Sequence, residues 1–152
     1  MILPDVNVLV IAHQSDVEGH RRMGAWFTDE VNSDRPFALA DLVVAGFLRI
    51  VTNPRIFPRP TPLPKAIAAV DGLRDQPTCL PVSAGERHWR IMRELLVDAD
   101  ARGNLVPDAH LAALALEHGA TVATRDRGFA RFPDLRWFDP LDDEGGSPAS
   151  RR

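Results

Sequence analysis

Short apolar runs alternate with longer helical patterns along this chain, and this alternation restricts the fold more than any other feature. The runs that resemble strands lie at residues 1–4, 36–40, 78–82, 121–124 and 135–138. Helices are predicted between them at 17–33, 42–52, 65–76, 85–102 and 107–118, with a short one ending at Arg131. Strands joined through helices pair in parallel, and the helices then cover both faces of the sheet. The pattern therefore predicts one α/β domain over residues 1–141, with a central, mostly parallel sheet.

The composition places the chain among folded globular domains. It has 152 residues, of which 45% are apolar and 26% charged. Cys79 is the only cysteine, which excludes a disulfide framework and a cysteine-rich zinc site. No apolar run is long enough to span a membrane, and residues 1–13 lack the basic leader of a secretory signal, so the expected location is the cytoplasm. Residues 142–152 are polar and rich in Gly and Ser, and they are expected to form a disordered tail.

The basic residues are almost all arginine. There are 17 Arg and one Lys, Lys65, against 21 acidic residues. Arginine favours forked contacts with phosphate or carboxylate groups. The net charge of −3 argues against binding nucleic acid over the whole surface, but it permits a basic rim around an acidic site.

Aspartates stand at the ends of three predicted strands. Asp5 and Asp41 each follow a strand at once, Asp126 follows the strand at 121–124, and Asp108 lies in the first turn of the helix at 107–118. In a parallel sheet the strand ends meet at one edge, and Asp108 can face them there. Each aspartate taken alone has a simpler interpretation, because aspartate is a favoured N-cap residue of helices.

Four carboxylates at one edge repel one another and raise each other's pKa, and a divalent cation removes that penalty. Oxygen ligands without a Cys or His cluster favour Mg²⁺, for which Mn²⁺ can substitute. An acidic Mg²⁺ site with an arginine-rich rim suits hydrolysis of phosphodiester bonds, because the metal activates water and stabilises charge on the phosphate.

Several stretches resemble a known family. Residues 1–9 read MILPDVNVL and are similar to the start of PIN domains, and residues 102–113 read RGNLVPDAHLAA and resemble the third acidic motif of VapC toxins. Residues 124–129 read TRDRGF and resemble the T-x-D-x-x-F motif of these toxins, while 46–55 and 136–137 look like one branch of the family. The resemblance covers residues 1 to about 141.

The resemblance implies a PIN-like α/β/α sandwich and a Mg²⁺-dependent endoribonuclease. It further implies the toxin half of a type II toxin–antitoxin pair, held inactive by a VapB-like antitoxin. Members of the family attack structured RNA, such as a tRNA anticodon loop or a ribosomal RNA loop, and they are usually homodimers.

Carried over residue by residue, the resemblance covers three of the four family acids. Asp5, Asp108 and Asp126 match the first, third and fourth, and they are the expected metal ligands. The second acid, a Glu in most PIN domains, has no counterpart in residues 43–46, which read VVAG. Asp41 is the nearest carboxylate, one helical turn before Val44, and it is either a catalytic residue or only part of the helix start. The predicted catalytic set is therefore Asp5, Asp41, Asp108 and Asp126.

Other polar side chains near these motifs have two interpretations each. Asn7 resembles the site-orienting Asn of the family or makes a local turn contact. The hydroxyl of Thr124 is placed to donate to Asp126 or to water, unless it is an ordinary strand residue. Arg125 and Arg127 flank Asp126 and bind phosphates or form a solvated surface. Candidates for an RNA path near the proline-rich loop at 54–64 are Arg49, Arg55 and Arg59, and the alternative is that this loop contacts a second copy of the chain or the antitoxin.

Single positions in the sequence argue against other enzyme classes. A haloacid-dehalogenase-type phosphatase needs a second Asp where Asn7 stands, and a receiver domain needs a late lysine, whereas Lys65 lies mid-chain. No glycine-rich nucleotide-binding loop occurs in the sequence. A catalytically inert PIN-like module that binds RNA or protein stays open, because the second family acid is missing.

Overall fold

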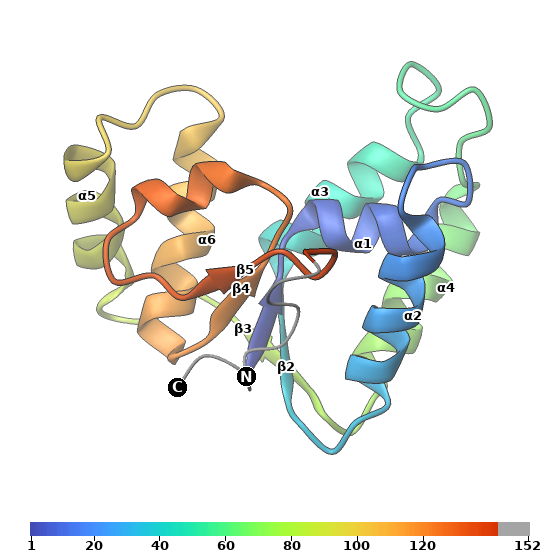
Figure 1. Cartoon of the computed structure of the whole chain (residues 1–152), viewed down its shortest axis with the longest axis horizontal. Helices are drawn as coiled ribbons and strands as arrows, with labels where there is room; N and C mark the ends of the chain where they lie inside the picture. The colour runs from blue at the N-terminus through green and yellow to red at the C-terminus, as the bar shows by residue number, and fades with distance from the viewer. Residues whose placement is uncertain (143–152) are drawn as a thin grey trace.

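A five-stranded parallel sheet forms the centre of the computed structural model, which describes residues 1–142 (Figure 1). The strand order is β3-β2-β1-β4-β5, and every pairing is parallel. The strands are β1 (Ile2–Pro4), β2 (Phe37–Ala40), β3 (Cys79–Val82), β4 (Thr121–Ala123) and β5 (Trp137–Phe138). The tail predicted at 142–152 lies, apart from Asp142, outside the described residues.

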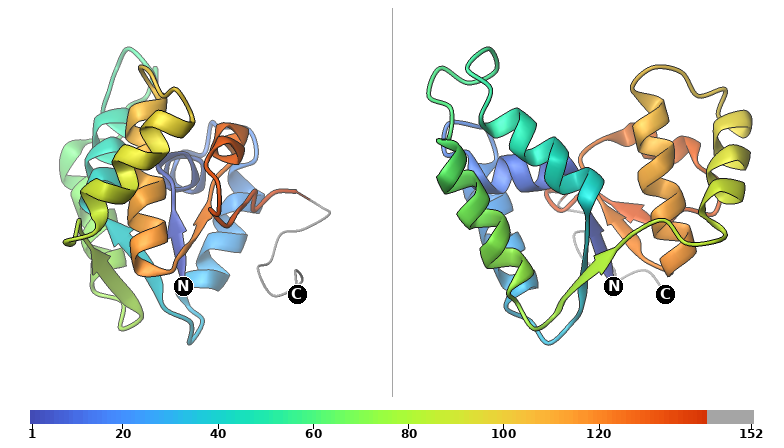
Figure 2. Two further views of the ribbon diagram at one scale, coloured as in Figure 1. Left: turned by 90° about the vertical axis from the view of Figure 1, so that its left-hand side faces the viewer. Right: turned by 180° about the vertical axis from the view of Figure 1, so that it is seen from behind.

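Helices cover both faces of this sheet. They are α1 (Val6–His13), α2 (His20–Val31), α3 (Asp41–Val51), α4 (Leu63–Arg74), α5 (His88–Asp98) and α6 (Leu105–His118), with a 3-10 helix η1 at Arg127–Arg131. The first four helices lie on one side of the sheet, and α5, α6 and η1 lie on the other (Figures 1 and 2). This arrangement confirms the predicted α/β/α fold. Within residues 1–142, no helix is both long and apolar enough to cross a membrane.

The central strands are buried because both faces of the sheet are covered. Leu3 and Ala38 are fully buried, and so are Val43 of α3 and Ala112 of α6, which pack from opposite sides. Strands enclosed in this way are nearly continuous apolar runs rather than alternating ones. The apolar runs of the sequence thus place the strands correctly.

The chain reverses its direction across the sheet between β1 and β4. From β1 it proceeds to β2 and β3 on one side, and the connection through α5 and α6 then returns it to β4 and β5 on the other. In open parallel sheets such a reversal leaves a crevice beyond the carboxyl ends of the two neighbouring strands, and ligands bind there. Asp5 and Thr124 immediately follow these two strands.

The helices differ from the predicted set by one missed helix and by several boundaries, the largest shift being in α5, which spans only His88–Asp98 of the predicted 85–102. Helix α1 is absent from the predicted set, because its residues are apolar apart from Asn7 and His13 and therefore show no one-sided stripe. It packs against both α2 and α3. The helix predicted at 17–33 begins only at His20, since Gly19 precedes it in the left-handed conformation with φ of 84°.

Candidate active site

Asp5 is held by three hydrogen bonds at the carboxyl end of β1. Its Oδ1 accepts from the backbone N–H of Val6 at 2.6 Å, which makes Asp5 the N-cap of α1. Its Oδ2 accepts from the hydroxyl of Thr124 at 2.7 Å and from Nδ2 of Asn7 at 2.6 Å. One carboxylate thus combines the capping role with a fixed position at the sheet edge.

Thr124 joins the ends of β1 and β4 through its hydrogen bonds. Its buried hydroxyl donates to Asp5 and accepts from Asn7 Nδ2 and from the backbone N–H of Asp126, both at 3.0 Å. The expectation that this hydroxyl donates to Asp126 is wrong, because its single proton is engaged by the buried Asp5 carboxylate. Asn7 also accepts from the backbone N–H of Arg125 at 3.2 Å, so it links the two strand ends as well.

Asp126 is the N-cap residue of η1 and is exposed. Its Oδ1 accepts from the backbone N–H of Gly128 at 2.7 Å. A Cβ on Gly128 would lie 2.9 Å from that oxygen, so the absence of a side chain leaves room for the carboxylate. Asp126 thus caps η1 with Oδ1, while its Oδ2 accepts no hydrogen bond within residues 1–142.

Asp108 faces this group from the first turn of α6 on the other side of the crevice. Its pKa is raised from the usual 3.8 to about 6, first by burial and then by the negative charges of Asp5 and Asp126. Burial also raises the pKa of Asp5, the hydrogen bonds from Thr124 and Val6 partly offset this rise, and the charge of Asp126 adds to it. The three carboxylates therefore act on one another electrostatically.

Asp41 lies apart from the other three acids. It is the first residue of α3, its side chain is 84% exposed, and it pairs with Nη1 of Arg74 on α4 at 3.3 Å. Ala40, not Asp41, occupies the N-cap position, and Asp41 makes no capping hydrogen bond with its side chain. The structure thus brings together Asp5, Asp108 and Asp126 and leaves Asp41 outside their group.

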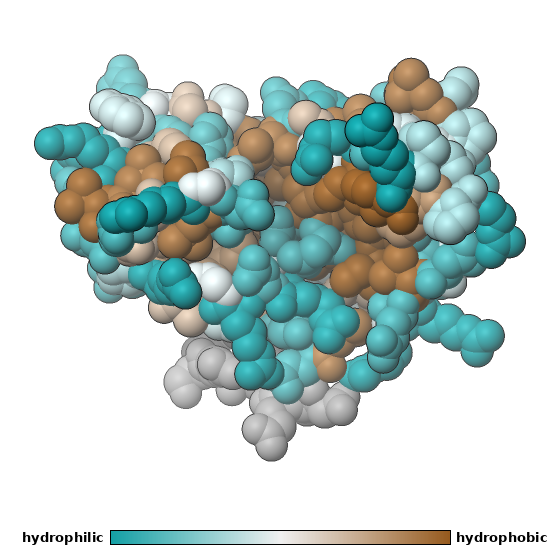
Figure 3. All heavy atoms as spheres, turned by 90° about the horizontal axis from the view of Figure 1, so that it is seen from above, coloured by the Kyte–Doolittle hydropathy of each residue, from teal (hydrophilic) through white to brown (hydrophobic). Residues whose placement is uncertain are grey.

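A cleft of about 480 Å³ opens between α3 and α6 beside these acids. Asp5 and Val6 lie at its base, Asp108 and Leu111 line the α6 side, and Arg49 lies among the residues of the α3 side. Seen from above, apolar side chains gather on this face between the two groups of helices (Figure 3). The α3 wall is thus the place where the second family acid is missing.

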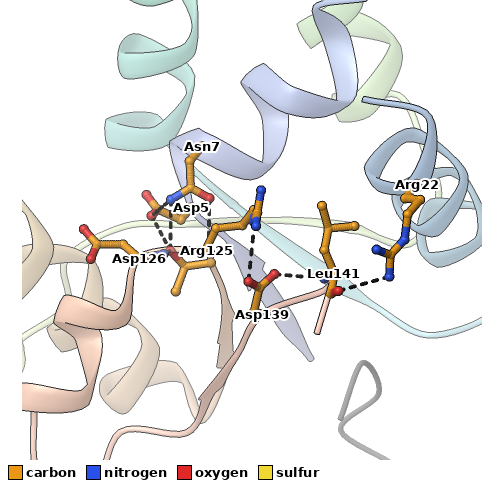
Figure 4. Close-up of polar contacts among 8 residues, drawn as sticks. Asp5, Asn7, Arg22, Arg125, Asp126, Asp139 and Leu141 are labelled. Atoms are coloured by element: carbon orange, nitrogen blue, oxygen red, sulfur yellow. Dashed lines mark hydrogen bonds and ion pairs between the residues drawn. The ribbon is translucent and has the colours of Figure 1, made fainter. Parts of the chain in front are cut away.

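Asp139 is a polar neighbour of the site that the sequence analysis missed. It lies directly after β5, and its Oδ2 is 3.4 Å from Nε of Arg125 (Figure 4). The same strand-end pattern that selects Asp5 and Asp41 would have found it. Among the other arginines of interest, Arg59 pairs with Asp16 at 2.8 Å, whereas Arg55 and Arg127 are exposed.

The donor set at the site suits a hard divalent cation. It consists of carboxylate oxygens with no Cys or His among them, and two of the acids have a pKa raised first by burial and then by neighbouring negative charge. Within residues 1–142, no three His, Cys, Asp or Glu side chains stand close enough to enclose a metal ion as they are. A bound cation would therefore have to draw the carboxylates together.

Comparison with known proteins identifies the family. A PIN-domain family model matches residues 2–135. Ribonuclease VapC43 of Mycobacterium tuberculosis (strain H37Rv) is 49% identical over 142 residues, which are 93% of this chain and 97% of that protein. The chain belongs to the VapC branch of the PIN-domain family.

Solved VapC structures share the fold. The VapBC2 complex of Rickettsia felis, bound to a DNA fragment from its promoter, aligns with a TM-score of 0.67 at 17% identity, covering 91% of this chain and 98% of that one. VapC20 of Mycobacterium tuberculosis, described as a sarcin–ricin loop cleaving toxin, aligns with a TM-score of 0.65 at 15% identity, covering 90% and 99%. At these identities the likeness concerns the fold, and it agrees with the predicted PIN-like sandwich.

Proposed function

We propose that this VapC-family chain is a metal-dependent endoribonuclease and the toxin of a VapBC-like toxin–antitoxin pair. The observation that carries the proposal is the convergence of Asp5, Asp108 and Asp126 at the crevice between β1 and β4. Relatives such as VapC43 are named ribonucleases, which supports the same activity here.

Asp5, Asp108 and Asp126 would hold the metal, with Mg²⁺ as the expected ion and Mn²⁺ as a substitute. When bound, such an ion lowers the pKa of a coordinated water and stabilises the charge of a phosphate under attack. Neighbouring residues of the chain fix the position and the charge of these carboxylates. Thr124 and Asn7 keep Oδ2 of Asp5 in one position, and the raised pKa of Asp108 makes this carboxylate a strong acceptor for a cation or a proton.

Asp41 has no direct part in this proposal. Its exposed side chain forms an ion pair with Arg74 and does not line the cleft. Catalysis is assigned to the three converging acids, and Asp41 contributes only its place in the first turn of α3.

The substrate and partners follow from the same assignment. Structured RNA, such as a tRNA or ribosomal RNA loop, is the proposed substrate, and a VapB-like antitoxin is the proposed inhibitor; the VapC20 and VapBC2 structures support these two proposals. A homodimer in the cytoplasm completes the proposal. Light scattering of the purified chain and co-purification with a small neighbour-encoded protein test the assembly.

An inert binding module is the second candidate, because the α3 wall carries no acid in residues 43–46. Cleavage of total cellular RNA, with the new ends mapped, separates the two candidates. Wild type and Asp108→Asn are compared with Mg²⁺, with Mn²⁺ and with a chelator. A discrete cut made only by wild type and only with metal supports the nuclease. Absence of any cut, in a folded protein free of antitoxin, favours the inert module.

A further inference from the structure

The cleft between α3 and α6 has two chemically different walls. Its base and α6 side carry the carboxylates of Asp5 and Asp108. Its α3 side is apolar, formed by residues such as Leu42, Ala45 and Ile50. A metal-assisted phosphate site therefore borders directly on a surface that suits an uncharged, flat group.

Arg49 is the one cation among the described residues that line this cleft. It lies in the last turn of α3 and is exposed. Within residues 1–142 it has no hydrogen bond or ion pair, whereas Arg59, Arg74 and Arg125 each pair with an aspartate. A guanidinium that lines an acidic cleft without a protein partner is available to a phosphate group of a ligand.

The shape of the α3 wall is set by a close approach of two helices. A Cβ on Gly46 would lie only 2.6 Å from Cγ2 of Val6 in α1, so the backbone of α3 lies directly against α1 at this position. The side chains on the neighbouring turns then border a hollow of about 480 Å³, within the usual size of small-molecule sites. That volume is large enough for a single nucleotide.

We propose that this cleft binds the unpaired nucleotide next to the phosphate that is cleaved. Arg49 contacts the phosphate of that nucleotide, and its base lies against Leu42, Ala45 and Ile50. This inference rests on the proposed ribonuclease function and deepens it. It specifies the substrate as a single-stranded segment, because only unstacked bases can leave the helix and enter a protein pocket.

Arg49→Gln tests the phosphate contact, with Arg49→Lys as the conservative variant. Arg90→Gln is the matched control, since Arg90 is exposed on α5 and does not line the cleft. The probe is a mixed-sequence, single-stranded RNA oligonucleotide, compared with the same sequence in a duplex. Cleavage gives kcat and KM, and equilibrium binding at several salt concentrations gives the number of phosphate contacts.

Loss of a charge-assisted contact raises KM about ten- to a hundredfold. The value of kcat changes little, because the contact is present in both the ground and the transition state. Each phosphate contact to a single strand contributes a slope of roughly 0.7 in log Kd against log salt, and Arg49→Gln is expected to lose that much. Arg49→Lys retains most of the slope, and Arg90→Gln matches wild type in every quantity.

Ala45→Phe tests the base pocket without touching the crowded Gly46. A phenyl group on this exposed position fills the apolar wall and is expected to weaken binding of the single strand at least tenfold. Binding of the duplex stays weak for both proteins.

The inference would be overturned if Arg49→Gln had the KM and salt slope of wild type and Ala45→Phe had its affinity for the single strand. That result would leave the proposed nuclease function intact. Weaker capture of an antitoxin by these variants, with unchanged RNA binding, would assign the cleft to protein instead. Absence of RNA cleavage by wild type would refute the proposed function. The salt slope, measured by binding alone, would still decide whether Arg49 contacts a phosphate.

Discussion

Replacement of Asp108 by Asn is expected to abolish the proposed RNA cleavage and yet stabilise the metal-free protein. The reason is the raised pKa of this carboxylate, about 6 against the usual 3.8. At neutral pH the folded protein must keep Asp108 ionised in a place where burial and the neighbouring Asp5 and Asp126 disfavour the charge. Asparagine has nearly the same shape and carries no charge.

The size of the effect follows from the pKa. The rise in the pKa of Asp108 from 3.8 to about 6 corresponds to roughly 3 kcal/mol, because each pKa unit is worth about 1.36 kcal/mol. Because Asp108 is only partly buried, solvent screening lowers the expected gain to about 1–2 kcal/mol.

The pH dependence has a defined sign. Between about pH 4 and pH 6 the folded state binds more protons at Asp108 than the unfolded state does, so the contribution of Asp108 to the stability of wild type falls as the pH rises through this range. An asparagine at this position does not titrate and has no such dependence. The stability difference between Asp108→Asn and wild type is therefore largest above pH 6 and vanishes below about pH 4.

Urea unfolding at pH 7.5 in a chelator measures the difference, and Asp41→Asn is the control for loss of an aspartate near the same edge. Saturating Mg²⁺ reverses the order, because an ion at a hundred times its Kd stabilises wild type by about 2.7 kcal/mol. If Asp108→Asn were no more stable than wild type in the chelator, the penalty that burial and the neighbouring acids place on the Asp108 charge would be refuted.

Three further substitutions test the framework of the site. Thr124→Val removes the hydroxyl that joins Asp5, Asn7 and Asp126. We expect the free energy of unfolding in urea to fall by about 1–3 kcal/mol and cleavage to be reduced, whereas Thr124→Ser retains the stability and the cleavage of wild type. Gly46→Ala is expected to destabilise the protein by about 1–3 kcal/mol through its clash with Val6, and a Val6→Ala background restores much of that loss in a double-mutant cycle. Asp41→Asn breaks only an exposed ion pair, so cleavage equal to wild type and a stability within about 0.5 kcal/mol are expected, and a large loss of rate would return Asp41 to the site.

Much of the site is predictable because it follows a local rule. A strand that ends in an aspartate is visible in the sequence, and parallel pairing brings such ends to one edge. Asp5 and Asp126 meet there because β1 and β4 are neighbours. Burial is the first cause of the raised pKa of Asp108, and the negative charges of Asp5 and Asp126 add the repulsion that the pattern predicts.

The same rule does not locate Asp41, because the order of strands is a property of the whole sheet. β2 lies on the far side of β1 from β4, and the first residue of α3 points to Arg74 on α4. The cleft was equally inaccessible to sequence reasoning. It is formed by α3 and α6, which come from opposite faces of the sheet, and no local pattern indicates that Arg49 and Asp108 line one hollow.

The central claim is that Asp5, Asp108 and Asp126 form one metal site. Its most direct test is a Mn²⁺ binding isotherm, followed by the electron paramagnetic resonance of the free ion, for wild type and for the Asp5→Asn, Asp108→Asn double variant. The account predicts one class of site in wild type with an affinity at least tenfold above that of the double variant. Equal affinities in two folded proteins would contradict it and leave the chain as an inert PIN-like module.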